Sequence, residues 1–266
     1  MSPILVFDIE TVADTQGYRR LHPELASLAD TDVLAIMHGE RLGDTGSTFQ
    51  RHHLHKIAAL SVALKHGEHF ALWSLGSEDS DEADIIRRFF QGIDKYTPTL
   101  VSWNGGGFDL PVLHYRALIH GIDAQRYFDI GDEDRDFRYN NYLSRYHWRH
   151  IDLMDILSLY QPRAAASLND IAVLCGYPGK LGIDGSAVQG LYDQGQLGAI
   201  RAYCETDVLS TYLVYLRFQR LRGHISAQQL AAEHDSVRHW LSSREDAHWQ
   251  EYLAAWQNAP THNQDP

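Results

Sequence analysis

The chain has 266 residues, 44% of them hydrophobic, and a formal net charge of −12 at pH 7. This length and this hydrophobic content are enough for one substantial core. A protein that coats DNA along its length is usually basic, so the net charge excludes that class and allows only a short, local contact with nucleic acid.

The cysteine content and the N-terminal residues predict a cytoplasmic protein. Only two cysteines occur, Cys175 and Cys204, which excludes a disulfide framework and indicates a reducing compartment. The first residues lack a basic segment and acids soon interrupt the apolar stretch, so we expect no secretory signal peptide. No apolar run in the sequence approaches the ~20 residues that span a bilayer, so we expect no membrane partner.

Strands and helices alternate in the N-terminal half of the chain. Residues 3–12 carry apolar side chains at both odd and even positions, which predicts a strand buried on both faces. Residues 15–50 have weak periodicity, and residues 39–47 are expected to form a loop because they are rich in turn formers. The other elements expected in this half are strands at about 57–65, 69–75 and 99–103 and helices over 78–93 and 109–121.

Helices dominate the C-terminal half, after a polar and irregular segment at 122–150. An amphipathic helical extension is expected over 226–256, and the tail 257–266 is expected to be disordered. We therefore predict one α/β domain over residues 1–225 with a helical C-terminal half, followed by this extension. The helices expected in the rest of this half lie at about 152–160, 167–175, 186–194 and 196–221, with a loop at 176–186.

Asp8 and Glu10 interrupt the apolar N-terminal strand. Because they are two residues apart, they point to the same face of that strand, as Ile4 and Val6 do. Two neighbouring buried carboxylates repel each other, and a divalent metal would resolve that repulsion, since Mg²⁺ favours carboxylate oxygens. The alternative is an exposed strand end whose acids meet water.

Asp109 and the pair Tyr203–Asp207 are further candidate site residues. Asp109 follows a strand and three glycines and opens a predicted helix, where aspartate is also a good cap or first-turn residue. Tyr203 and Asp207 are four residues apart, which places them on one face of a helix, one turn from each other. That spacing also arises by chance, so each motif alone leaves a purely structural role open.

Taken together, the three motifs resemble those of the DEDD superfamily of 3′–5′ exonucleases, in its tyrosine-bearing subclass. D-x-E ends the first strand at residues 8–10, N-G-x-x-F-D spans 104–109, and Y-x-x-x-D spans 203–207. The histidine subclass carries its histidine at the position that is Ala202 here.

Other segments resemble the predicted exonuclease family related to the proofreading domain of family-B DNA polymerases. These segments are HKIAALSVAL, HIDLMDIL, GKLGIDGSAV and YCETDVLSTYLVYLR. The resemblance runs from about residue 3 to 220 and implies a ribonuclease-H-like fold, a mixed five-stranded sheet flanked by helices. The remaining residues are too few for a polymerase domain, so we expect a stand-alone exonuclease.

The resemblance implies a metal-dependent enzyme that removes nucleotides from the 3′ end of nucleic acid, with single-stranded DNA as the expected partner. Asp8, Glu10, Asp109 and Asp207 would hold two Mg²⁺ or Mn²⁺ ions. By analogy with the family, Asp8 would bridge both ions, Glu10 and Asp207 would hold the ion that binds the attacking water, and Asp109 would act on the second ion. Tyr203 would orient the water, because an ordinary tyrosine pKa near 10 makes it a poor base at neutral pH.

Three other functions fit part of the sequence. A 3′–5′ exoribonuclease of the same superfamily would carry the same motifs, because discrimination can depend on the 2′-hydroxyl. A non-catalytic nucleic-acid-binding domain would explain the fold, but the presence of all four acids and the tyrosine counts against it. A glycoside hydrolase uses paired carboxylates, yet it gives no role to Asp109, Tyr203 and Asp207 together.

Three substrate contacts are predicted from the resemblance. Asn104 and Phe108 lie near the 3′-terminal nucleotide in the family, so Phe108 could stack on a base, and a core phenylalanine is the alternative. Lys180 matches a segment near the active site and could touch phosphate, with an ordinary turn as the alternative.

Two more contacts are predicted in the loop 137–150, which interleaves arginines, histidines and aromatic residues. This composition suits a groove that tracks a nucleic-acid backbone, and Arg145 and Arg149 are its candidate phosphate contacts. A solvated loop is the alternative, because acidic residues precede it. Asp152, just after the loop, either supports the metal site or caps a helix.

Overall fold

A five-stranded sheet forms the centre of the computed structural model, which describes residues 3–182 and 184–259. The strand order is β3-β2-β1-β4-β5. β2 is antiparallel to both of its neighbours, whereas β1, β4 and β5 are mutually parallel. This mixed sheet confirms the predicted ribonuclease-H-like fold. The strands are β1 (Ile4–Ala13), β2 (His55–His66), β3 (His69–Ser74), β4 (Thr99–Ser102) and β5 (His150–Asp152).

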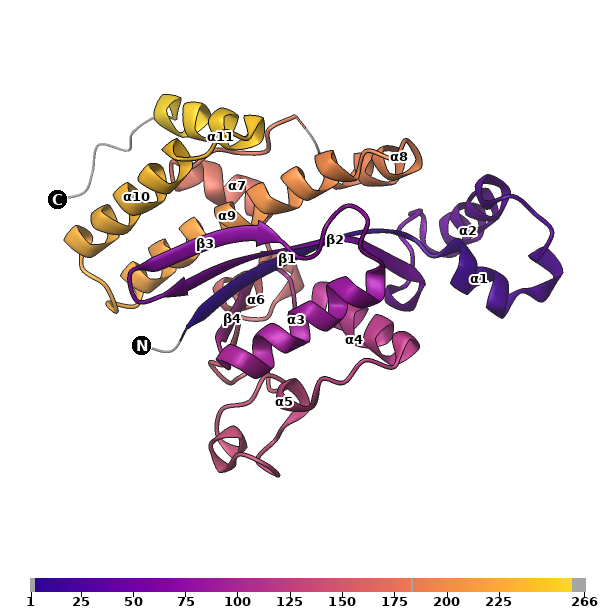
Figure 1. Cartoon of the computed structure of the whole chain (residues 1–266), viewed down its shortest axis with the longest axis horizontal. Helices are drawn as coiled ribbons and strands as arrows, with labels where there is room; N and C mark the ends of the chain where they lie inside the picture. The colour runs from indigo at the N-terminus through magenta and orange to yellow at the C-terminus, as the bar shows by residue number, and fades with distance from the viewer. Residues whose placement is uncertain (1–2, 183, 260–266) are drawn as a thin grey trace.

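Helices cover both faces of the sheet, and the chain beyond β5 is helical, as predicted (Figure 1). α9, α10 and α11 lie on one face, α3 and α4 lie on the other, and α1 and α2 project from the end of the sheet (Figure 1). The helices are α1 (Thr15–Leu21), α2 (Asp30–Thr45), α3 (Glu82–Tyr96), α4 (Asp109–His120), α5 (Gln125–Phe128), α6 (Leu153–Leu157), α7 (Leu168–Leu174), α8 (Val188–Asp193), α9 (Leu197–Leu221), α10 (Ala227–Ser242) and α11 (Ala247–Asn258).

β1 is buried on both faces because its alternate residues enter two different cores. Val6 packs in the core under α9, while Leu5 and Phe7 pack in the core against α3 and α4. Asp8 and Glu10 continue the Val6 face and therefore point toward α9. β1 pairs with β4 only as far as Val6, so both acids lie beyond the end of β4, where the glycine-rich turn begins.

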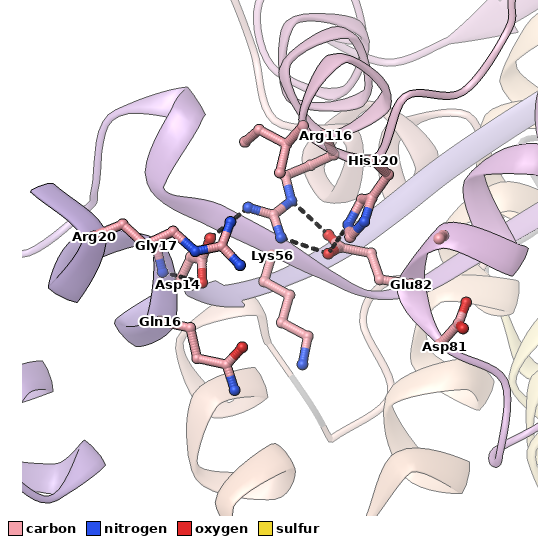
Figure 2. A pocket seen from close by; sticks show the side chains of 11 residues that line it. Asp14, Gln16, Gly17, Arg20, Lys56, Asp81, Glu82, Arg116 and His120 are labelled. Atoms are coloured by element: carbon pink, nitrogen blue, oxygen red, sulfur yellow. Dashed lines mark hydrogen bonds and ion pairs between the residues drawn. The ribbon is translucent and has the colours of Figure 1, made fainter. Parts of the chain in front are cut away.

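A buried ion-pair network fixes the far end of β1 (Figure 2). Arg116 of α4 reaches both Asp14, which follows β1, and Glu82 of α3, with N–O distances of 2.5 Å in each case. Glu82 also accepts a hydrogen bond of 2.7 Å from the backbone N–H of Ile57 in β2. The three charged side chains are at most 8% exposed. The network therefore holds β1, β2, α3 and α4 in one arrangement.

The structure differs from the sequence prediction in three places. α2 runs through most of the predicted loop 39–47, because Val33 and Met37 bury one side of the helix against Tyr18, and Gly46 ends it with φ at 75°. β5 has only three residues, too few to show a periodicity, and the helix expected over 152–160 is the shorter α6. Of the predicted disordered tail, residues 257–258 are helical and residues 260–266 lie outside the described part of the chain.

The C-terminal extension shares the core of the sheet. Leu230 and Trp240 of α10 and Trp249 of α11 belong to the buried cluster that contains Val6 of β1. The predicted boundary at 225/226 falls in the turn between α9 and α10, and apolar packing is continuous across it. Among the described residues, no helix combines the length and apolar character needed to cross a membrane.

Candidate active site

Three carboxylates meet beside the middle of β1, just beyond the point where its pairing with β4 ends. Asp8 and Glu10 come from β1, and Asp207 comes from α9, which packs across that strand. One ligand oxygen from each of the three lies within 4.8 Å of the others, close enough to share a metal ion. Strands and long helices hold side chains more rigidly than loops do, so the cluster is preformed.

Burial raises the pKa of every acid in this cluster, and repulsion by neighbouring acids adds to the rise for Asp8 and Glu10. For Asp8 burial is the main cause, followed by the negative charges of Asp109, Glu10 and Asp207, and the pKa lies well above its usual value. Burial, then Asp207 and Asp109, raises the pKa of Glu10 in the same way. The pKa of Asp207 rises to about 6 through burial, against the opposing effect of Lys180.

These acids fit divalent metal ions of the Mg²⁺ and Mn²⁺ type. All ligand atoms are carboxylate oxygens, which such hard cations prefer. Burial first, and then the charges of the neighbouring acids, disfavour the ionised form of Asp8 and Glu10 and raise their pKa values. A bound cation would supply positive charge and favour the ionised carboxylates.

Asp109 approaches the cluster from α4, which packs on the face of the sheet opposite α9. It is the first residue of α4, but its Oδ1 accepts a hydrogen bond of 3.1 Å from the backbone N–H of Ile9. The residue that caps α4 is Phe108, whose side chain makes no capping bond, so Asp109 ties the helix to β1 and does not act as the cap. Burial is the main cause that raises the pKa of Asp109 to about 7.

The glycine-rich turn brings Asp109 to this position. Asn104 adopts a left-handed conformation with φ of 63°. Asp152 accepts hydrogen bonds from the backbone N–H groups of Asn104 at 2.9 Å and Gly106 at 2.8 Å, and it also caps α6. A Cβ at Gly105 would lie 2.3 Å from the Ser102 hydroxyl oxygen, so no side chain fits there. Asp152 thus combines helix capping with support of the turn beside the acids.

Tyr203 lies against the acid cluster and donates its hydroxyl hydrogen bond to Asp207. Burial, followed by the charges of Asp207 and Glu10, raises the pKa of Tyr203 far above its usual value. The hydroxyl therefore stays protonated, so it can donate a hydrogen bond but cannot act as a general base. The Lys180 ammonium lies 5.5 Å from the centre of the Tyr203 ring, which places a cation at the mouth of the cluster.

Phe49 and Phe108 form an aromatic wall near Asp109. The sequence predicted Phe108 as a substrate contact but not Phe49. The half-buried Phe108 ring lies 5.3 Å from the Phe49 ring and 5.1 Å from the His55 ring. Phe49 is 55% exposed and comes from the segment between α2 and β2, where the sequence shows no periodicity that could mark it. The wall thus offers an exposed aromatic face next to a candidate metal ligand.

Arg145 and Arg149 are both held by partners close to them in the sequence. The Arg145 guanidinium pairs with Asp155 at 3.0 Å and stacks over Tyr160, with 4.5 Å between guanidinium and ring centre. Arg149 donates to the backbone carbonyl of Asn140 at 2.7 Å. Arg145 is exposed and Arg149 is half-buried, and contact of either guanidinium with a phosphate stays a prediction.

The comparisons with known proteins agree with this geometry. Residues 47–256 match the model of a family described as "Predicted 3'-5' exonuclease related to the exonuclease domain of PolB". The chain belongs to this family. This exonuclease therefore carries Asp109, Tyr203 and Asp207 inside the matched region, whereas Asp8 and Glu10 precede it.

The curated relatives of this exonuclease are much longer proteins. Over 150 residues the chain is 25% identical to the catalytic polypeptide of DNA polymerase epsilon from Saccharomyces cerevisiae, and over 147 residues it is 29% identical to that from Aspergillus fumigatus. Each match covers 53% of this chain and 6% of the polymerase polypeptide. The structure of the family B DNA polymerase from the hyperthermophilic archaeon Pyrobaculum calidifontis matches with a TM-score of 0.49 and 18% identity, over 80% of this chain and 24% of that one.

Proposed function

We propose that this exonuclease uses divalent metal ions to remove nucleotides from the 3′ end of single-stranded DNA. The observation that carries the proposal is the convergence of Asp8, Glu10 and Asp207 within 4.8 Å, with Asp109 bonded to the same strand. Four carboxylates from three distant segments have no shared structural purpose at this point. A site for two cations gives all four a role.

The two ions would be held from the α9 side of the sheet by Asp8, Glu10 and Asp207. Asp109 would be the fourth carboxylate ligand. Two bound Mg²⁺ or Mn²⁺ ions would activate a water for attack on phosphorus and stabilise the leaving 3′-oxygen. Tyr203 supplies a protonated hydroxyl that orients the attacking water by hydrogen bonding. Lys180 supplies a positive charge for the scissile phosphate at the mouth of the cluster.

The aromatic wall supports a single-stranded substrate. Phe49 and Phe108 present ring faces beside Asp109, and base–aromatic stacking is worth about 1–3 kcal/mol per base. A terminal base can reach such a face only when it is unpaired. DNA is favoured over RNA because the relatives that match are named as DNA polymerases.

The test uses matched oligonucleotides with the full chain. DNA and RNA strands of one sequence, single- and double-stranded and labelled at the 5′ end, are incubated with Mn²⁺ or with EDTA. The proposal predicts a ladder of 3′-shortened single-stranded DNA with Mn²⁺, none with EDTA, and none with Asp8→Asn. Degradation of RNA in preference to DNA would identify an exoribonuclease, and equal activity of Asp8→Asn would remove the site from the proposal.

A further inference from the structure

We infer that Arg145, Tyr146 and Tyr160 form a second contact site for the single strand, which binds nucleotides upstream of the one that is removed. These three side chains are called the tyrosine platform below. The inference rests on the proposed function only in taking a single nucleic-acid strand as the substrate. The platform lies outside the metal site and the aromatic wall, where the loop 137–150 meets the segment that follows α6.

Tyr146 presents an aromatic ring to solvent. It is 74% exposed, and its ring packs against the half-buried ring of Tyr160 in a T-shaped arrangement, with 5.5 Å between the ring centres. The Tyr160 hydroxyl donates a hydrogen bond of 2.9 Å to the backbone carbonyl of Arg145, the residue before Tyr146. Tyr160 thus fixes the position of the Tyr146 ring while that ring stays accessible. An accessible ring with a fixed position is a surface on which a nucleobase stacks.

Arg145 places a positive charge beside this ring. Its guanidinium lies 4.5 Å from the centre of the Tyr160 ring and 3.0 Å from Asp155 Oδ2. The bond to Asp155 uses one of the five N–H donors of the guanidinium, and the arginine side chain is 53% exposed. The other donors are free to bind a phosphate. Sites that bind single strands without sequence preference combine these two groups, an aromatic ring for the base and a cation for the backbone.

The backbone that carries Tyr160 is strained. Leu159 and Tyr160 both adopt left-handed conformations, with φ of 52° and 60°, which residues with a Cβ rarely do. Leu159 is 73% exposed, so burial of its side chain does not offset the strain. The Tyr160 N–H donates to the Asp155 carbonyl at 2.7 Å, which holds the turn closed. Glycine would relieve the strain at position 160 but would remove the ring, and strain of this kind is concentrated at binding sites.

Asp152 connects the platform to the glycine-rich turn of the active site. It accepts hydrogen bonds from two backbone N–H groups of that turn, and its Oδ1 also accepts from the Asp155 N–H at 3.3 Å. Asp155, the partner of Arg145, is about 5 Å farther along α6 at a rise of 1.5 Å per residue. Phe108 of the aromatic wall follows the same turn. The wall and the platform therefore lie close enough for a few consecutive nucleotides to contact both.

The test measures the affinity of the full chain for thymidine strands of two and ten nucleotides. Binding is followed by fluorescence anisotropy in EDTA, which removes the metal ions, and thermal melting establishes that each variant is folded. The wild type should bind the longer strand more tightly, because only that strand reaches the platform. Tyr146→Ala should weaken binding of the ten-nucleotide strand at least about fivefold, the lower end for one stacked base, and leave the two-nucleotide strand unaffected.

Arg145→Gln should change the salt dependence of binding. The slope of log Kd against log salt concentration for the ten-nucleotide strand should fall by about 0.7, the value for one phosphate of a single strand. Two matched controls remove an exposed ring and an exposed charge outside the platform. Tyr139→Ala removes a ring that is 85% exposed in the same loop, and Arg135→Gln removes an exposed guanidinium just before it. We expect wild-type affinity and salt dependence for both controls.

Three results would overturn the tyrosine platform. They are wild-type binding of the ten-nucleotide strand by Tyr146→Ala, an equal loss for both strand lengths, and an equal loss in Tyr139→Ala.

Shortening of the ten-nucleotide strand with Mn²⁺ separates the platform from the proposed function. If the wild type shortens the strand and Tyr146→Ala binds it like the wild type, only the platform is wrong. If the strand stays intact with Mn²⁺ while Tyr146→Ala weakens its binding, the proposed function is wrong and the platform stands. If the wild type does not bind the strand, both are wrong.

Discussion

Because its acids are buried, the metal-free protein should lose stability as the pH rises from 5 to 8. The perturbation is a rise in pH from 5 to 8 in the presence of EDTA, applied to the wild type and to Asp109→Asn. Asparagine keeps the oxygen that accepts from the Ile9 N–H and removes only the titrating group. The difference in unfolding free energy between the two proteins therefore isolates Asp109.

The sign and size follow from the pKa of Asp109, which rises from 3.8 to about 7 on folding. Between these values the folded state binds a proton that the unfolded state has released, so the free energy of unfolding falls as the pH rises. Within the window the loss runs from pH 5 to the folded pKa near 7, and two pH units at about 1.4 kcal/mol each give about 3 kcal/mol. This is an upper limit, because the neighbouring acids release their protons one after another.

One buried and two half-buried histidines change the stability with pH in the opposite direction, so their contribution has to be subtracted. Burial lowers the pKa of His55, His114 and His150 to about 4. Their folded pKa values lie below the usual 6.5, so they destabilise the fold as the pH falls from there toward 4. They are present in both proteins, which is why the wild-type minus variant difference is the quantity to compare.

Urea unfolding followed by circular dichroism provides the assay. The stability of the wild type relative to Asp109→Asn should decrease by up to about 3 kcal/mol from pH 5 to pH 8 in EDTA. Mn²⁺ at a hundred times its dissociation constant should return about 2.7 kcal/mol at pH 8 to the wild type. A pH-independent difference in EDTA would refute the reasoning, since it would mean that burial does not raise the pKa of Asp109.

Three further predictions concern single side chains. Arg116→Met should lower the free energy of unfolding in urea by about 3–5 kcal/mol because its two carboxylate partners stay buried, whereas the exposed Arg88→Met should cost less than about 1 kcal/mol. Equal effects would contradict the buried network. Tyr203→Phe should lower kcat by up to about 100-fold with little change in Mn²⁺ affinity, and an unchanged kcat would exclude water positioning by this hydroxyl. Phe49→Ala should raise KM for single-stranded DNA at least about fivefold, the lower end of stacking energies, and an unaltered KM would remove the wall from the substrate site.

Short-range patterns were sufficient for the strand that anchors the site. Apolar residues on both faces of β1 predicted its burial, and the spacing of Asp8 and Glu10 predicted their common direction. The motif around Asp109 did not distinguish a site residue from a helix cap, because aspartate is also common at the start of a helix. Only the tertiary contact with the Ile9 N–H shows that its carboxylate faces β1.

Local sequence patterns did not predict the contacts between segments that are distant in the chain. Phe49 reaches Phe108 across 59 positions of the chain, and no periodicity in its segment marks it. Cys204 meets Asp8 across 196 positions, as one buried residue in an apolar helix. β5 joins the sheet with three residues, where pairing with β4 and not propensity decides the conformation.

A crystal of the full chain soaked in Mn²⁺ and measured at the manganese absorption edge tests the central claim most directly. We predict two anomalous peaks among the carboxylates of Asp8, Glu10, Asp109 and Asp207, and their loss in Asp8→Asn. Peaks elsewhere on the molecule, or ordered carboxylates with no peak between them at saturating Mn²⁺, would contradict a two-metal site.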